Sequence, residues 1–346
     1  MKNSLLLFTT ILALLFSQTS FSQRVYGVVL DGDTNKPIEG ASVYFDNTSI
    51  GVSTDENGEF NLYRNKKIKS PLIISFVGYR TMTHKDFSEV KRRTFYLYES
   101  NSVLNDVIIN TNDGWSRKLK MKEFLKRFLG ETKNGKASYI LNKEDIVLRY
   151  NKRRKQLTAT AKTPIYIKNH NLGYLIQVEL KHFEANYSYV SKNNQRKSLD
   201  FVYYAGYNFF KSTNEKLSEK TIQNRKETYE DSVLRFMRAL AREELSKKKY
   251  RLFLGNQPIN EKNYIKVTPL GEDYFVSVDL RKKLNIYKKG KQSSIESFVD
   301  EFYIDSFGNH FPSDKVRFGG DFGVKRMGDT LPLDYLDIDA KEKEAN

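Results

Sequence analysis

The stretch STDENGEFNL, residues 53 to 62, joins two β-like runs through one tight turn. Asn57-Gly58 is a dipeptide that supplies the positive φ angles of a hairpin turn. After the turn, Phe60 and Leu62 alternate with polar residues, as side chains do in a strand with one buried face. The stretch therefore predicts a β-hairpin within a strand-rich N-terminal region.

The same residues have part of the spacing of a calcium-binding loop. An EF-hand-like loop with Gly58 at its sixth position would place Asp55 at position three, but Ser53 at position one and Arg64 at position twelve. Calcium needs a bidentate carboxylate at position twelve, where this chain has a cation. The segment DGDTNK fails likewise, because Lys36 takes the glycine position. We interpret both segments as turns, with Asp55 accepting hydrogen bonds from turn amides, and predict neither a metal site nor a cofactor.

Short β-like runs continue on both sides of this hairpin, between residues 24 and 109. The runs are RVYGVVLD, ASVYFDN, GEFNLYR, PLIISFVGY, RTFYLYES and NDVIIN. Turn-forming Asp-Gly, Asn-Lys-Pro and Asn-Gly sequences separate them. Several short strands in so few residues predict a small β-sandwich.

Glycines and apolar residues recur in a fixed order in this region. The order is Val25-x-Gly27-x-Val29, Asn35-Lys36-Pro37-Ile38-x-Gly40-Ala41-x-Val43, Thr48-x-x-Gly51-x-x-Thr54-Asp55-x-x-Gly58-x-Phe60-x-Leu62 and Ser75-Phe76-Val77-Gly78-Tyr79. It resembles the carboxypeptidase-regulatory-like domain and covers about a quarter of the chain. The resemblance implies a transthyretin-like sandwich in an exported protein of Bacteroidota. In that family the domain accompanies catalytic domains and does no chemistry itself. Residues 104–109 resemble the segment that follows the domain in TonB-dependent receptors, but too few residues remain for a receptor barrel.

The first residues have the order of a secretory signal peptide. A short polar start precedes an apolar run over residues 4–16, and small residues follow at Ser20 and Ser22. The apolar run is too short to span a bilayer. We predict a signal peptide over residues 1–22, cleavage before Gln23, and a periplasmic or outer-membrane-associated mature protein without a transmembrane segment.

The formal charge of +16 is unevenly distributed along the chain. Residues 24–109 contain eleven basic and eleven acidic residues, whereas residues 115–155 contain fourteen basic and four acidic ones. This change marks a domain boundary near residues 110–114. We predict a sandwich at 24–109 and an α+β domain of unknown function at 115–340. The chain has no cysteine, which excludes disulfides, thiolate ligands and a thiol nucleophile.

Two main helices are predicted in the second domain. Apolar residues recur at helical spacing over 115–129, with Asp113 or Ser116 as the cap and Gly130 as the end. A second helix with an apolar stripe is predicted over 226–247. The other runs are strand-like, including ASYILN, DIVLRY, LGYLIQVELKHF, LDFVYYAGYNFF and DYFVSVDL. We therefore predict a mainly β protein, in which an N-terminal transthyretin-like β-sandwich precedes an α+β domain with a mostly antiparallel sheet.

Five motifs stand out in this second region: Phe128-Leu129-Gly130, Pro164-x-x-Ile167-x-Asn169-x-x-Leu172-Gly173-Tyr174, Phe236-Met237-Arg238-Ala239-Leu240, Ile304-Asp305-x-x-Gly308-Asn309 and Leu331-Pro332-Leu333-Asp334-Tyr335. They are similar to motifs in the conserved-hypothetical C-terminal region of standalone Bacteroidota proteins with the same leading domain. The similarity implies an architecture and a compartment, but no reaction.

Catalytic motifs are weak in this sequence. The histidines lack the spacing of a zinc-binding pair; they are His84, His170, His182 and His310. Neither a nucleophile elbow nor a P-loop is found. Glycosidases need only two carboxylates, and four cluster late in the sequence: Asp321, Asp329, Asp334 and Asp337. A hydrolase acting on carbohydrate or peptidoglycan is therefore the alternative hypothesis.

A basic run joins two strand-like stretches: Lys152, Arg153, Arg154 and Lys155. Its plainest interpretation is a solvated hairpin loop. The export signal argues against a nucleic-acid partner, whereas guanidinium groups suit the sulfate and phosphate of anionic polysaccharide or lipopolysaccharide. We predict a non-catalytic envelope binding or assembly module, accessory to outer-membrane polysaccharide handling, with an outer-membrane protein as another candidate partner.

Overall fold

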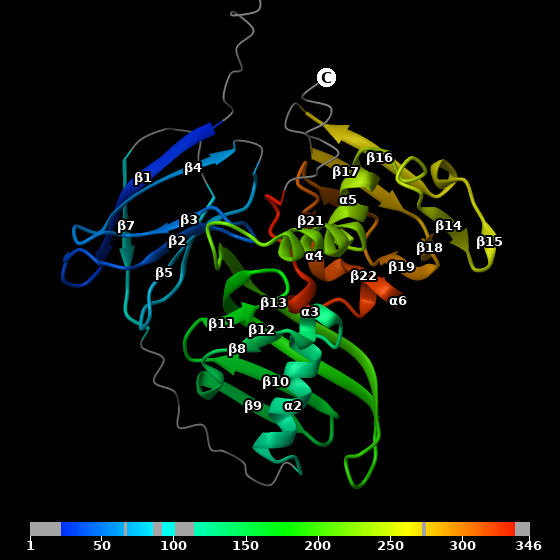
Figure 1. Cartoon of the computed structure of the whole chain (residues 1–346), viewed down its shortest axis with the longest axis horizontal. Helices are drawn as coiled ribbons and strands as arrows, with labels where there is room; N and C mark the ends of the chain where they lie inside the picture. Colours follow the sequence, from blue (N-terminus) through cyan, green and yellow to red (C-terminus); the bar gives the residue numbers. More distant parts are fainter. Residues whose placement is uncertain (1–21, 66–67, 86–91, 101–113, 272–274, 336–346) are drawn as a thin grey trace, which may run out of the picture.

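The computed structural model describes residues 22–65, 68–85, 92–100, 114–271 and 275–335. Most of the structure is antiparallel β-sheet with a few helices (Figure 1). The predicted signal peptide lies outside these residues, except for its last residue. Of the helices in the described ranges, none is long and apolar enough to cross a membrane.

The N-terminal region forms a two-sheet sandwich, as the alternating pattern predicts. One sheet has the order β4-β1-β7 and the other β3-β2-β5-β6. Neighbouring strands are antiparallel, apart from the parallel pair β1 and β7. Val29 and Phe60 of the first sheet and Val43 and Ile74 of the second share one core. The strands are β1 Ser22–Asp31, β2 Ser42–Phe45, β3 Gly51–Ser53, β4 Glu59–Asn65, β5 Leu72–Ser75, β6 Met82–His84 and β7 Arg93–Leu97.

The turn between β3 and β4 has the hydrogen bonds predicted for it. Asp55 Oδ1 accepts the backbone N–H of Asn57 at 3.0 Å and that of Glu59 at 2.8 Å. Gly58 has a φ of 71°, and a Cβ there would lie 2.5 Å from the carbonyl oxygen of Val29. Both the positive φ and this close approach require glycine.

A third sheet, of six strands, follows, with the order β8-β11-β12-β10-β9 and with β13 paired to β12. Its strands are β8 Ser138–Ile140, β9 Ile146–Asn151, β10 Gln156–Ala161, β11 Ile165–Asn169, β12 Tyr174–Val190 and β13 Lys197–Ser212. Helix α2, Arg117–Phe128, packs on β9 and β10. The Ser116 side chain caps it and Gly130 follows with a φ of 93°, which confirms the first predicted helix.

The C-terminal part contains two further antiparallel sheets, β15-β14-β18-β19-β22 and β16-β17-β20-β21. Their core, which includes Phe236, Ile286 and Phe302, is separate from the core under α2. The proposed division of the chain at 115–340 stays a prediction. The strands are β14 Arg251–Leu254, β15 Gln257–Pro258, β16 Ile265–Leu270, β17 Phe275–Leu280, β18 Leu284–Lys288, β19 Lys291–Ser297, β20 Glu301–Ile304, β21 His310–Phe311 and β22 Val316–Gly319. The short helices are α3 Lys133–Lys136, η1 Lys143–Asp145, η2 Glu261–Asn263, η3 Ser313–Lys315, α6 Gly320–Gly323 and η4 Met327–Asp329.

The second predicted helix, over 226–247, is two helices with earlier bounds. Helix α4 spans Glu219–Glu230 and α5 spans Val233–Ala241. The break occurs because the Ser232 side chain accepts the N–H of Arg235 at 3.0 Å and starts a new helix. An apolar stripe by itself does not reveal such an internal cap.

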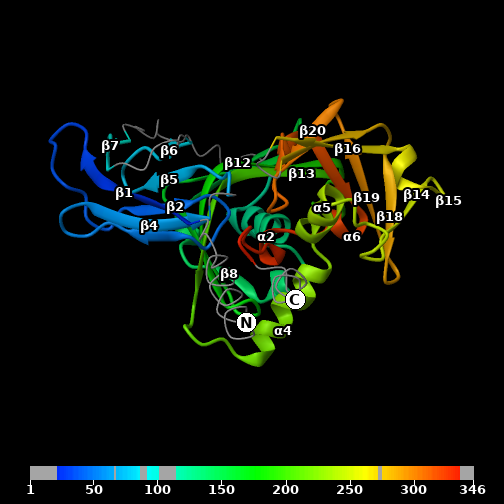
Figure 2. The same cartoon turned by 90° about the horizontal axis from the view of Figure 1, so that it is seen from above.

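The sandwich packs through its β3-β2-β5-β6 sheet on strands β12 and β13. Figure 1 shows these sandwich strands between β1 and β4 on one side and the β11–β13 region on the other. Tyr44 of β2 stacks on Phe209 of β13, with ring centroids 5.1 Å apart. Ser75 of β5 donates a hydrogen bond to Glu179 of β12. The view from above shows the sandwich strands beside β12 and β13 (Figure 2).

Residues 331–335 connect the sandwich to the C-terminal part. The N–H of Leu333 donates to the carbonyl oxygen of Asn47, in the β2–β3 loop, at 2.7 Å. The Asp334 carboxylate accepts both the N–H and the hydroxyl of Ser49 in the same loop. We call residues 331–335 the strap.

The strap is held from its other side by Arg238 of α5, which is only 4% exposed. Its guanidinium donates to the carbonyl oxygens of Leu333 at 2.7 Å, Tyr335 at 3.0 Å and Phe307 at 2.9 Å, and to the Tyr229 hydroxyl at 3.2 Å. A single buried cation therefore joins three segments that are far apart in the sequence.

Candidate functional site

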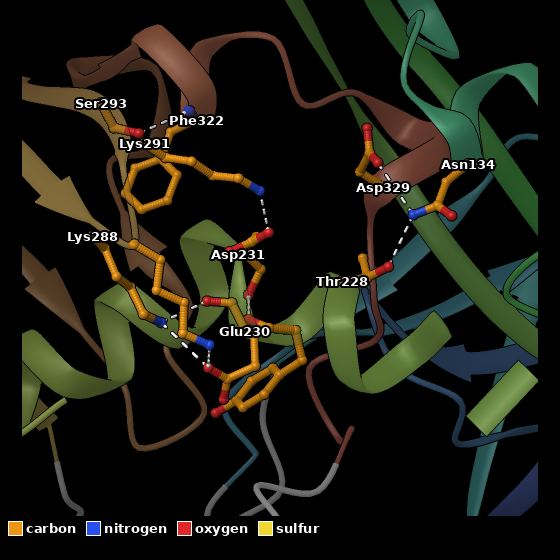
Figure 3. Close-up of polar contacts among 12 residues, drawn as sticks. Asn134, Thr228, Glu230, Asp231, Lys288, Lys291, Ser293, Phe322 and Asp329 are labelled. Carbon is orange, nitrogen blue, oxygen red and sulfur yellow. Dashed lines mark hydrogen bonds and ion pairs between the residues drawn. The ribbon is translucent and has the colours of Figure 1, made fainter. Parts of the chain in front are cut away.

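A charged pocket lies where the end of α4 meets β18, β19 and α6 (Figure 3). Its lining residues are Glu230, Asp231, Tyr250, Ile286, Lys288, Lys291, Ser293, Asp321, Phe322 and Lys325. The cavity volume is about 20 Å³, which is room for about one water molecule. The pocket as it stands is too narrow to enclose a sugar ring.

Opposite charges cancel inside this pocket. Glu230 lies 3.1 Å from Arg235 Nε and 3.6 Å from Lys288 Nζ, and its backbone oxygen accepts the Lys288 ammonium at 2.7 Å. Asp231 pairs with Lys291. Figure 3 shows Glu230 and Asp231 facing Lys288 and Lys291 across the pocket. The ion pairs tie the end of α4 to β18 and β19.

Lys288 is a pocket residue with a lowered pKa. Burial, followed by the nearby Arg235, lowers the pKa of Lys288 to about 8. This pKa stays above neutral, so Lys288 is mostly charged at pH 7. Its ammonium also lies 4.5 Å from the centre of the Tyr250 ring. These contacts fit a structural cation better than a free amine nucleophile.

Asp329 forms a separate polar joint, also visible in Figure 3. Its carboxylate accepts the Thr132 hydroxyl at 2.8 Å and the Asn134 side-chain amide at 3.3 Å. Asn134 also donates to the Thr228 hydroxyl at 2.9 Å. Asp329 therefore fastens α3 and α4 to the segment before the strap.

The four late carboxylates are thus distributed over different places. Asp321 lines the pocket and Asp329 binds Thr132, whereas Asp334 binds Ser49 at the sandwich. Asp337 lies outside the described residues. Proximity in sequence did not show which partners each carboxylate would have.

The histidines also lie in separate surroundings instead of forming one cluster. His310 is half-buried, and desolvation lowers its pKa to about 4, so it is neutral at pH 7. His182 Nε2 lies 3.6 Å from Glu184, and His170 packs against the Tyr139 ring. Within the described part of the chain, no group of three or more His, Cys, Asp or Glu side chains is arranged to hold a metal ion.

The basic run forms the turn between β9 and β10, and all four side chains are exposed: Lys152, Arg153, Arg154 and Lys155. The Asn151 side chain accepts the N–H of Arg154 at 2.9 Å, and Lys155 has a φ of 50°. In the described residues, no ion pair joins these cations to an acidic side chain. Their charge therefore faces solvent.

A second turn brings more positive charge to the same end of the sheet. The Lys155 ammonium donates to the carbonyl oxygen of Ser188 at 2.8 Å, and Asn194 of the β12–β13 turn donates to Gly114. That turn carries exposed Lys192 and Arg196. We call the following six residues the basic end: Lys152, Arg153, Arg154, Lys155, Lys192 and Arg196.

Neighbouring cations differ from the basic end because Glu123 neutralises them. The buried Glu123 of α2 lies 3.1 Å from Lys197 Nζ and 3.4 Å from Arg127, and it accepts the Tyr187 hydroxyl at 3.0 Å. The Lys197 ammonium also lies 5.3 Å from the Trp115 ring. Only part of the local positive charge is therefore available to a partner.

Sequence reasoning missed Lys192 and Arg196 as members of this site. They follow the first turn by about forty residues, and only the pairing of β10 with β12 brings the two turns together. The available signal was a second basic turn between two strand-like runs.

One family model matches part of this chain. Residues 25–109 are similar to the CarboxypepD_reg-like domain. The match covers the sandwich from β1 to β7 and agrees with the resemblance in its glycine pattern. No curated protein sequence matches the chain. The CarboxypepD_reg-like match stops at residue 109, so the basic end and the charged pocket both lie outside it.

Proposed function

We propose that the protein is a non-catalytic binding or assembly module of the bacterial cell envelope, and that its basic end holds an anionic polymer. The observation that carries the proposal is the convergence of two exposed basic turns without acidic partners in the described structure. Polysaccharide bearing sulfate or phosphate, including lipopolysaccharide, has the complementary charge.

Three features support the envelope as the compartment. The residues before β1 have the order of a signal peptide. The CarboxypepD_reg-like match is of a kind abundant in exported Bacteroidota proteins, and the later motifs resemble the C-terminal region of their standalone forms. We propose a periplasmic or outer-membrane-associated protein, with an outer-membrane protein as the alternative partner of the same surface.

The experiment compares retention on heparin and on immobilised lipopolysaccharide across a salt gradient. The test variant replaces three exposed cations by serine: Lys152, Arg153 and Arg154. Lys155 stays, because its backbone has a positive φ. Exposed charges are screened over about 8 Å at physiological salt, so we expect the parent to elute at clearly higher salt than the variant.

A matched control separates local charge from net charge. The control variant replaces an exposed basic triplet of the C-terminal part by serine: Arg281, Lys282 and Lys283. It loses the same charge and should elute close to the parent. Equal elution of both variants would mean that the basic end is only a solvated surface.

Hydrolysis of carbohydrate or peptidoglycan stays the alternative proposal. Its support is that Glu230, Asp231 and Asp321 line one pocket, although this pocket would have to open before it could hold a sugar ring. Release of reducing sugar or peptide fragments by the parent, abolished by Asp321→Asn, would support it over the binding proposal.

A further inference from the structure

The side of the β8–β13 sheet that faces away from α2 is only partly covered. The α2 side holds the core, which includes Leu157 of β10 and Ala185 of β12, with Val202 of β13 packed against it. Side chains alternate in a strand, so the neighbours of these residues point to the opposite side. The sandwich covers one end of that opposite side, where Ser42 donates to Gln177 at 3.3 Å. The other end is free to meet a partner of the protein.

Two rows of side chains cross β10, β12 and β13 at this uncovered end. The first row begins directly after the β9–β10 turn, so it adjoins the basic end. In strand order, the rows are Gln156, Asn186 and Phe201, and then Thr158, Glu184 and Tyr203. We call these six residues the polar face. Neighbouring strands lie about 4.8 Å apart, so the polar face spans roughly 10 Å across the three strands, which suits two linked sugar rings.

The centre of the polar face consists of hydrogen-bonding side chains. Glu184 is half-buried, and its carboxylate accepts the Gln156 amide at 2.7 Å and lies 3.6 Å from His182 Nε2. Thr158 and Asn186 are also half-buried. A protein interface has an apolar centre inside a polar rim, whereas this surface has a polar centre. Such a centre fits a partner that is rich in hydroxyl groups.

Aromatic rings lie at the margin of the polar face, on β13. Phe201 is 37% exposed. Tyr203 is half-buried, with its ring centre 5.4 Å from that of His182. A rigid aromatic ring offers a large contact area at low entropic cost. Polar groups beside aromatic rings suit a sugar unit, because a sugar has hydroxyl groups at its edge and C–H groups on its faces.

Charge indicates which kind of polysaccharide fits. The polar face contains one acid, Glu184, and the exposed Arg149 of β9 lies opposite Thr158 in the next strand. The adjoining basic end has six exposed cations, and none of them pairs with an acidic side chain in the described part of the chain. Positive charge therefore dominates where the two surfaces meet. A polymer that crosses from one surface to the other is acidic.

We propose that the polar face binds sugar units of an acidic polysaccharide whose sulfate or phosphate groups lie at the basic end. The inference rests on the proposed function, because it places a further part of the same polymer. Sugar hydroxyls bind Gln156, Thr158 and Asn186, and the C–H faces of the sugar rings pack on Phe201 and Tyr203. A polyanion without sugar rings uses the basic end alone.

The test compares two polyanions by isothermal titration calorimetry on the whole protein. Heparin contains sugar rings, whereas inorganic polyphosphate does not. The variant Phe201→Ala, Tyr203→Ala should raise the dissociation constant of heparin about tenfold and leave that of polyphosphate unchanged. The variant Gln156→Ala, Thr158→Ala keeps both rings and should change heparin binding in the same direction.

The experiment contains its own controls. Unchanged polyphosphate binding shows that a polar-face variant is folded, because this binding needs an intact basic end. The matched control Tyr63→Ala, Tyr96→Ala removes two exposed rings from the sandwich and should bind both polymers as the parent does.

Two outcomes overturn the inference. In the first, both polar-face variants bind heparin as tightly as the parent. In the second, both variants lose heparin and polyphosphate binding to the same extent. The proposed function is tested separately by the variant in which serine replaces Lys152, Arg153 and Arg154, which should bind both polymers more weakly. If that variant binds polyphosphate as the parent does, it is the proposed anion site that is wrong.

Discussion

The sandwich and the β8–β13 sheet are both built mainly from antiparallel strands, but their surface charge and the contacts that stabilise them differ. In the sandwich, charges balance and tyrosines are exposed on the outer sheet, whereas the end of the β8–β13 sheet presents six cations. Turns within the sandwich are closed by nearby side chains such as Asp55. The β8–β13 region relies on partners such as Glu123, which binds Lys197 far along the chain. The comparison shows that one type of sheet can support two surfaces of different charge.

The strap and the β2–β3 loop determine how independent these two regions are. Asn47, Ser49 and Asp334 join the sandwich to the rest of the chain through polar contacts. The sandwich has its own core, so we expect residues 24–109 to fold alone. Its stability inside the whole protein, however, should include contributions from these polar contacts with the strap.

The largest expected effect comes from Arg238→Ala. Removing this buried guanidinium leaves three carbonyl oxygens and one hydroxyl without their donor. We expect the free energy of unfolding to fall by about 3–5 kcal/mol in denaturant titration. Exposed Arg251→Ala is the control and should cost about 0.5 kcal/mol or less. A loss below about 1 kcal/mol for Arg238→Ala would show that the strap is held mainly by other contacts.

A smaller expected effect is the pH dependence of stability that arises from Asp46, which contacts Asn208 of β13. Burial raises the pKa of Asp46 to about 7, above its value of 3.8 in an unfolded chain. Between pH 4 and 7 the folded state therefore keeps a proton that the unfolded state has lost. The contribution of this bound proton to the free energy of unfolding is fully present below pH 4 and is lost as pH rises through 7. We expect this loss to be about 2–4 kcal/mol.

The measurement is the free energy of unfolding between pH 4 and 8 for the parent and Asp46→Asn. The variant should show a flatter decline over this range, because its side chain does not titrate. Glu56→Gln, on the sandwich surface, should retain the slope of the parent. Parallel curves for the parent and Asp46→Asn would contradict a buried, protonated Asp46.

The stacked rings of Tyr44 and Phe209, between the sandwich and β13, should give a still smaller effect. Tyr44 and Phe209 should show a coupling energy of about 1 kcal/mol in a double-mutant cycle with alanine. Phe76 and Tyr79, which pack within the sandwich, provide the matched pair inside one region. A coupling near zero for Tyr44 and Phe209 would mean that the sandwich is attached mainly by polar contacts.

Calcium should have no effect on either region. Asp55 Oδ1 is already engaged by two turn amides, and the would-be ligand positions hold Ser53 and Arg64. Thermal unfolding in millimolar calcium should therefore match unfolding in chelator. A higher midpoint that disappears in Asp55→Ala would reveal a ligand bound by the native state.

Local sequence determined much of the fold. The positive φ of Gly58 and the cap at Ser116 depend on neighbours within a few residues, so the β3–β4 turn and α2 could be predicted. The same local rules act at Ser232, but its cap was hidden within an apolar helical stripe, and the predicted helix became α4 and α5. Alternation also placed the sandwich core, because side chains in strands alternate between two faces.

Tertiary structure decided the rest of what bears on function. Pairing of β10 with β12 added Lys192 and Arg196 to the basic end, and packing on β13 desolvated the half-buried Asp46 and raised its pKa. The outward face of the β4-β1-β7 sheet is exposed because the other sheet of the sandwich makes the contact with β12 and β13. Turn geometry and helix caps depend on neighbours along the chain, whereas burial and surface charge depend on which distant segments pack together.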